Sequence, residues 1–159
     1  MKLFLPILLF LFANPDLAEV RKLYTDAAKS ESNTKAFNEK VATIADNDPD
    51  KVLVAYKGCG LTLNSKFSKV LVDKISFMKA GAKLIDAAVA ADPNNVEIRM
   101  IRLSVQESVP KIVGYRANKK EDKAMILKNF KDTGELKEYI RNFINQSKSF
   151  TPAERKSLK

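Results

Sequence analysis

The chain contains no histidine, no tryptophan, one cysteine and only five glycines among its 159 residues. Without histidine it lacks the commonest general base of enzyme active sites. Its single cysteine, Cys59, excludes an internal disulfide and any zinc site built from several thiolates. The glycines are scattered and form no phosphate-binding loop. We therefore expect a protein that is not an enzyme and that holds no cofactor and no metal.

Carboxylates are the remaining groups that could act as catalysts. They occur in pairs such as Asp46 with Asp48 and Glu121 with Asp122. Both pairs fall at predicted corners or helix starts, where capping and the helix dipole explain acidic residues. The alternative is a hydrolase that uses carboxylates alone, which needs two acids about 5 to 10 Å apart in a cleft.

Long apolar runs are also rare, and the one present lies at the start of the chain. Residues 1–13 combine a basic opening, Met1-Lys2, with the apolar run LFLPILLFLFA. This run is too short to span a bilayer and is typical of a secretory signal peptide, with cleavage between positions 13 and 18. The alternative is a buried N-terminal strand or helix. Because no similar run follows, we expect no transmembrane segment in the mature chain, residues 14–159.

Export without disulfides favours a bacterial periplasmic or extracellular location over a small eukaryotic secreted domain. The formal net charge of +9 is unevenly placed, because residues 111–159 hold 13 basic against 6 acidic residues. Such a basic third can attract anionic polysaccharide, lipid headgroups or an acidic protein. The alternative is a lysine-rich surface that only maintains solubility. Nucleic acid is disfavoured as a partner, because few aromatic residues alternate with the basic ones.

Apolar residues repeat at helical spacing along almost the whole chain, and no segment indicates a strand. The sequence predicts an all-α fold of about seven to eight helices in one domain. We expect a first helix after the Asn14-Pro15-Asp16 start and a second that ends at Asp48-Pro49. The later helices are expected at 50–63, 69–91, 96–108, 121–131 and 136–145, with loops at 64–68 and 111–120. The Thr151-Pro-Ala-Glu154 capping box predicts a last, short helix.

Two helix–Asp-Pro–helix corners stand out, one in residues 85–99 (IDAAVAADPNNVEIR) and a weaker copy in 41–51 (VATIADNDPDK). Counted back from Pro93, Gly81, Ile85 and Ala88 occupy the small, large apolar and alanine positions of a tetratricopeptide hairpin. The segment 50–95 therefore resembles a tetratricopeptide-type repeat, although the two corners are 44 residues apart and the usual period is about 34. The resemblance implies stacked antiparallel helical hairpins.

The corner Asp-Pro-Asn-Asn-Val-Glu-Ile-Arg is also similar to one in small exported helical proteins of Bacteroidetes type. This second resemblance covers about residues 20–130. It implies a fold and an exported location, but no activity.

One candidate site is a face of the helix after Pro93, where Arg99, Arg102 and Gln106 are spaced i, i+3 and i+7. Paired arginines can hold a carboxylate or phosphate by bidentate hydrogen bonds. The alternative is that they pair with acids of a neighbouring helix, such as Asp73 or Asp86, and fix helix packing.

The tetratricopeptide resemblance implies a second candidate, a partner-binding groove. Its inward positions correspond to Tyr56 and Asn64 in one hairpin and, in the next, to Glu97, Met100 and Ser104. Tyr56 and Met100 are equally compatible with the core. Cys59 lies between two glycines, which indicates a small buried residue and not a nucleophile.

These patterns together predict an exported, tetratricopeptide-like helical module that binds or scaffolds a protein partner in the cell envelope. The candidate partner-binding residues are Tyr56, Asn64, Glu97, Arg99, Arg102 and Gln106. The alternative function is a basic module that binds envelope polyanions electrostatically.

Overall fold

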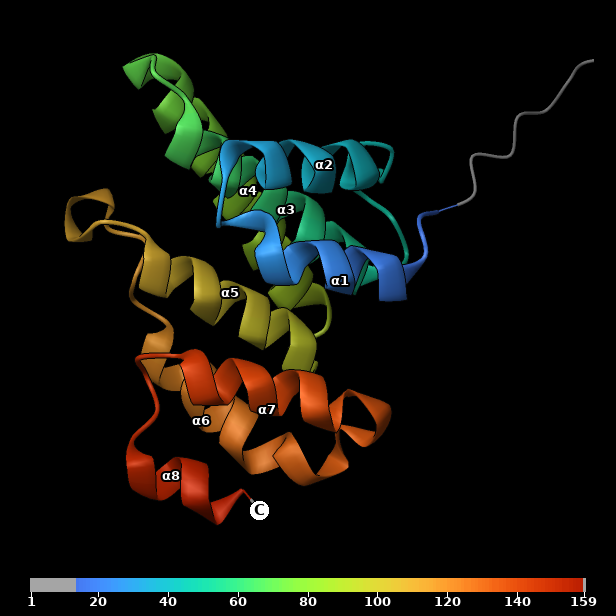
Figure 1. Cartoon of the computed structure of the whole chain (residues 1–159), viewed down its shortest axis with the longest axis vertical. Helices are drawn as coiled ribbons and strands as arrows, with labels where there is room; N and C mark the ends of the chain where they lie inside the picture. The colour runs from blue at the N-terminus through green and yellow to red at the C-terminus, as the bar shows by residue number, and fades with distance from the viewer. Residues whose placement is uncertain (1–13, 159) are drawn as a thin grey trace, which may run out of the picture.

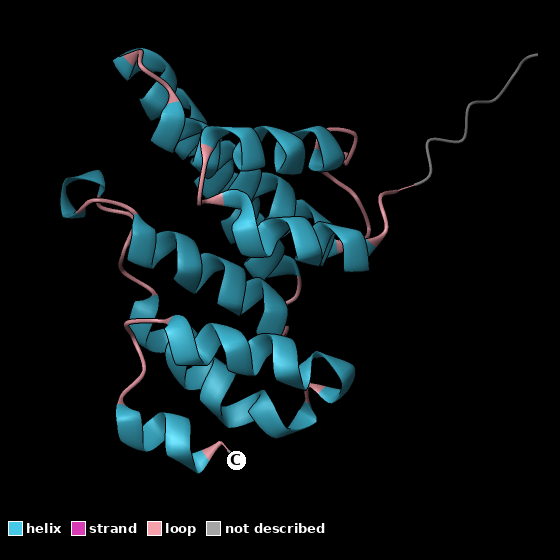
Figure 2. Cartoon of the chain, viewed as in Figure 1, coloured by secondary structure: helices cyan, strands magenta, loops and turns pink. Residues whose placement is uncertain are grey.

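The computed structural model describes residues 14–158, and the predicted signal peptide, 1–13, lies outside the described residues. The described chain folds into eight α-helices with three short 3₁₀ turns and no strand, so the predicted all-α fold is confirmed (Figure 2). The helices are α1 Leu17–Ala27, α2 Glu31–Val41, α3 Lys51–Phe67, α4 Leu71–Ala91, α5 Val96–Ser108, α6 Lys119–Asn129, α7 Lys137–Gln146 and α8 Pro152–Ser157. The 3₁₀ turns are η1 Lys111–Val113, η2 Phe130–Asp132 and η3 Gly134–Leu136.

Side-chain caps set where most of these helices begin. Asp50 accepts hydrogen bonds from the amides of Val52 and Leu53 at the start of α3, and Asn95 caps α5 in the same way. Such caps satisfy amide groups that have no partner inside the helix. The capping box predicted at Thr151 is confirmed at the start of α8.

Two predicted helix boundaries are wrong. The second helix does not continue to Asp48-Pro49 but ends at Val41, and Ile44 is buried from a turn that follows it. The predicted loop at 64–68 is mostly helical, because α3 continues to Phe67. Asn64 stays within α3, where its carboxamide oxygen accepts a hydrogen bond from Asn38 on α2 at 2.8 Å. The polar run 64–68 does not end α3 before Phe67. It contains neither glycine nor proline, the two residues that disfavour a helix most.

Helix α3 lies at the centre of the α1–α5 part of the fold and packs against α1, α2, α4 and α5. Its closest neighbour is α4, because Gly58 and Gly81 face one another where the two helices cross. A Cβ on Gly58 would lie 2.7 Å from the carbonyl oxygen of Gly81. The absence of side chains at these two positions allows the two helix backbones to approach closely.

Helix α5 connects the two ends of the molecule. Figure 1 shows it between the α1–α4 group and the group formed by α6, α7 and α8. It packs against α3 and α4 on one side and against α6 and α7 on the other. Two segments project from the same side of the view, the turn between α3 and α4 and the segment that contains η1.

Among residues 14–158, no helix is both long and apolar enough to cross a membrane.

Candidate functional site

A large groove opens between these two projections, and we call it the central groove. It has a volume of about 1300 Å³ and is lined from α1, α3, α4, α5, η1 and α7. The buried part of its wall is mainly apolar and includes Cys59, Met78, Met100 and Val105. A concave, mainly apolar surface is the usual setting of a binding site.

Apolar side chains extend from this wall into solvent along two edges, which we call the α4 lip (Leu71 and Ile75) and the η1 lip (Ile112 and Val113). Leu71 is 70% exposed and Ile112 is 96% exposed. All four side chains line the central groove. Exposed apolar residues that gather around a concavity mark an interaction surface more often than isolated ones do.

The charge along the central groove has one sign. Lys66, Lys74 and Lys79 line it, and no aspartate or glutamate does. Lys66 donates a hydrogen bond to the carbonyl oxygen of Ala28 at 2.7 Å, whereas Lys74 and Lys79 form no salt bridge with any residue of the described chain. The groove therefore presents positive potential to a bound group.

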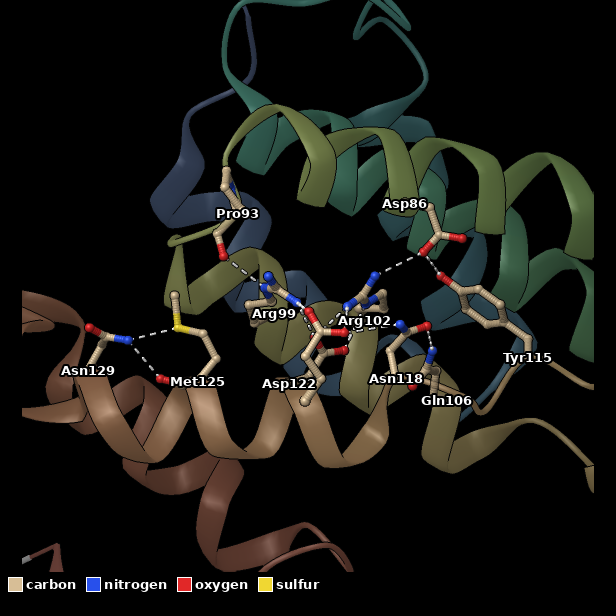
Figure 3. Close-up of polar contacts among 11 residues, drawn as sticks. Asp86, Pro93, Arg99, Arg102, Gln106, Tyr115, Asn118, Asp122, Met125 and Asn129 are labelled. Carbon is tan, nitrogen blue, oxygen red and sulfur yellow. Dashed lines mark hydrogen bonds and ion pairs between the residues drawn. The ribbon is translucent and has the colours of Figure 1, made fainter.

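A chain of polar contacts holds the η1 side of the groove in place (Figure 3). Tyr115 follows η1, and its hydroxyl donates a hydrogen bond to Asp86 of α4 at 2.9 Å. Arg102 of α5 also donates to this carboxylate, at 3.4 Å, and is itself anchored by Asp122 at 2.6 and 2.8 Å. The network fixes the segment after α5 against α4 and α6.

Arg99 and Arg102 are both buried and both directed at Asp122 of α6. Arg99 also donates to the carbonyl oxygen of Pro93 at 2.9 Å and to Glu121. Hydrogen bonding to Arg99 lowers the pKa of Glu121 below its ordinary value. Of the two partners considered from the sequence, Asp86 contacts Arg102, while Asp73 forms no salt bridge with any of the described residues. The two arginines therefore fix the packing of α5 on α6.

Glu97 and Tyr56 belong to a second internal network, which joins α1, α3, α5 and α7. The Glu97 carboxylate is only 2% exposed and accepts two hydrogen bonds from Arg21, both at 2.7 Å, and one from Tyr56 at 2.6 Å. The hydroxyl of Tyr56 lies 2.9 Å from that of Tyr139. Burial, together with the negative charge of Glu97, raises the pKa of Tyr56 well above its ordinary value. This network stabilises the interior and leaves neither Glu97 nor Tyr56 open to a partner.

The remaining candidates lie apart from one another. Gln106 is buried and donates a long hydrogen bond, 3.4 Å, to Asn118. Asn64 is half-buried and lines a separate, smaller cavity between α2, α3 and α4. Cys59 is buried in the wall of the central groove, as expected of a small residue between two glycines, and burial raises the pKa of its thiol to about 12. No group of three or more acidic or cysteine side chains within residues 14–158 is placed to hold a metal ion.

None of the six predicted partner-binding residues lines the central groove. Two residues that the tetratricopeptide resemblance placed at inward positions, Met100 and Ser104, do line it. The two lips were missed, although the sequence carries a signal for them. That signal is a pair of apolar runs among polar residues, Val70-Leu71-Val72 and Ile112-Val113. The members of each run are consecutive, so the apolar face of one amphipathic helix cannot bury them all.

Comparison of the chain with protein-family models, with curated proteins and with solved structures finds no match.

Proposed function

We propose that the protein is an exported helical binding module whose central groove holds an apolar segment of a partner protein in the bacterial envelope. The observation that carries this proposal is the pair of exposed apolar lips on either side of a groove of about 1300 Å³. A partner that covers both lips removes their apolar surface from water, at about 25 cal/mol for each Å² buried.

Two features of the chain support the rest of the proposal. The basic and apolar pattern of residues 1–13 favours export. The contacts of α1 with α3, of α3 with α5 and of α5 with α7 are those expected if the helices form consecutive hairpins, as in a divergent tetratricopeptide-like array. In such an array, alternate helices line one shared surface. Residues of α1, α3, α5 and α7 all line the central groove.

The test is capture of a partner from envelope extract by three forms of the protein. The wild type and Val72→Asn are expected to retain the same partner, and Ile75→Asn/Ile112→Asn is expected to lose it. Val72 is the matched control because it is 73% exposed on α4, next to Leu71, but does not line the groove. Equal capture by all three forms would contradict the proposal.

The salt dependence of capture separates this function from the polyanion-binding alternative. Binding through apolar lips persists when salt is raised, because apolar burial is not screened. Binding of an acidic polymer by the lysines of residues 111–159 is weakened strongly by salt. Material that is lost at high salt and is insensitive to Ile75→Asn/Ile112→Asn would support the alternative instead.

A further inference from the structure

We propose that the occupant of the central groove is an amphipathic α-helix of about three turns that carries carboxylates along one flank. This inference rests on the proposed function and names the kind of segment that the partner supplies. Its basis is the size of the groove, the placement of its charged residues and the chemistry of its two walls.

The size of the groove matches a short helix. A helix about 10 Å across that rises 1.5 Å per residue occupies roughly 120 Å³ per residue. The volume of about 1300 Å³ therefore corresponds to roughly eleven residues, or about three turns. It exceeds the range of roughly 300–1000 Å³ that is usual for small-molecule sites.

The two walls of the groove differ in charge. The wall formed by the end of α3 and by α4 carries Lys66, Lys74 and Lys79. The opposite wall, from α5, η1 and α7, carries uncharged polar residues: Ser104, Ser108, Asn142 and Gln146. A helix seated with its apolar stripe on the groove wall directs one flank to each side. Charge complementarity places carboxylates on the α4 flank and amide or hydroxyl groups on the other.

The same features disfavour two other occupants. A second copy of this chain is disfavoured because the formal net charge of +9 opposes self-association at a lysine-bearing surface. An acyl lipid is disfavoured because hydroxyl and amide groups line the groove and because Leu71 and Ile112 stay exposed at its edges. A partner helix covers these exposed edges and also offers hydrogen-bonding side chains, which an acyl chain lacks.

The experiment measures binding of two designed peptides by fluorescence anisotropy. Each is about 18 residues long, above the length of about 12 to 15 residues below which isolated helices are marginal in water, with leucines spaced i, i+3, i+4 and i+7. One flank carries glutamates in the first peptide and lysines in the second. We expect the wild type to bind the glutamate peptide at least tenfold more tightly than the lysine peptide.

Charge reversal on the protein tests the contact directly. The variant Lys74→Glu/Lys79→Glu is expected to reverse this preference. The matched control, Lys128→Glu/Lys131→Glu, makes the same change in net charge at positions of α6 and η2 outside the groove and is expected to keep it. Circular dichroism of each variant establishes that it is folded.

Each result separates the inference from the proposed function. Equal affinity for both peptides, abolished by Ile75→Asn/Ile112→Asn, overturns the acidic flank but leaves the groove as a protein-binding site. Equal loss in the control variant overturns the inference in favour of a general charge effect. Failure of both peptides, together with binding of monomeric lysophosphatidic acid, overturns the inference and the proposed function together.

Discussion

At the residue scale, Asp122 is the shared ion-pair partner that joins α5 to α6. Its side chain is fully buried and receives hydrogen bonds from both Arg99 and Arg102, which are also buried. Removal of one member of a buried ion pair leaves the opposite charges without a partner in a medium of low polarity. The sequence identified the two arginines and, in Asp86, one acid that Arg102 contacts, but it did not identify Asp122 as their shared partner.

We predict that Asp122→Ala lowers the free energy of unfolding by about 3 to 5 kcal/mol, because two buried guanidinium groups lose their shared partner. Urea denaturation followed by circular dichroism measures this change. The control is Asp132→Ala, at an exposed carboxylate, which is expected to stay within about 0.5 kcal/mol of the wild type. Similar effects of the two substitutions would show that the buried network does not hold α5 on α6.

The lowered pKa of Glu121 leads us to predict that the stability of the protein depends on pH. Its hydrogen bond with Arg99 lowers its pKa in the folded state below the ordinary value of 4.5. A carboxyl group with a lowered folded-state pKa stabilises the protein above the unfolded-state pKa, and this contribution is lost as the pH falls through the folded-state value. We therefore expect Glu121→Gln to reduce the loss of stability on acidification below about pH 4.5. Denaturation at several pH values measures it, and exposed Glu135→Gln is the control. An unchanged acid profile in Glu121→Gln would refute the assignment.

At the scale of elements, the contact between α3 and α4 depends on the absence of a side chain at Gly58. Alanine at this position gains roughly 1 kcal/mol of helix propensity, but its Cβ would lie 2.7 Å from a backbone carbonyl that cannot rotate away. We predict that Gly58→Ala lowers the free energy of unfolding by about 1 to 3 kcal/mol, because overpacking outweighs propensity.

The comparison variant for Gly58→Ala is Gly134→Ala, which adds a side chain at a glycine outside the contact between α3 and α4. Gly134 has a φ of 54°, but a Cβ added there would meet no atom within 4 Å, so its cost is only the backbone strain of about 1 to 2 kcal/mol. Urea denaturation compares both variants. A stabilised Gly58→Ala protein would show that the two helices do not touch at their backbones.

Helical periodicity and capping residues predicted the existence and order of the helices, because those signals are local. The boundary errors at α2 and α3 arose where tertiary contacts decided the outcome. Ile44 is buried from a turn, and Asn64 is held within α3 by Asn38. The central groove was not predicted, because it is formed by side chains from segments far apart in the sequence, such as Leu71 and Ile112. The i, i+3 spacing of Arg99 and Arg102 indicated one helical face, but it could not show whether that face was buried.

At the scale of the whole molecule, two charged networks join the helices to one another, and the central groove is the proposed binding surface. One network, centred on Glu97, joins α1, α3, α5 and α7, and the other, centred on Asp122, joins α5 to α6 and α4. Glu97 and Asp122, the centres of the two networks, are both buried, and the networks hold the helices in register. The central groove is left apolar and lysine-bearing, which suits the proposed binding of a partner segment.

The methionines offer the most direct test of the claim that the central groove is the binding surface. Met78 and Met100 line the groove, whereas Met125 lies on α6 outside it. The measurement is a nuclear magnetic resonance titration of the protein, labelled at its methionine methyl groups, with the glutamate-flanked helical peptide. The account predicts that the Met78 and Met100 signals shift together and saturably while the Met125 signal stays fixed. A shift of Met125 alone, with Met78 and Met100 unmoved, would contradict it.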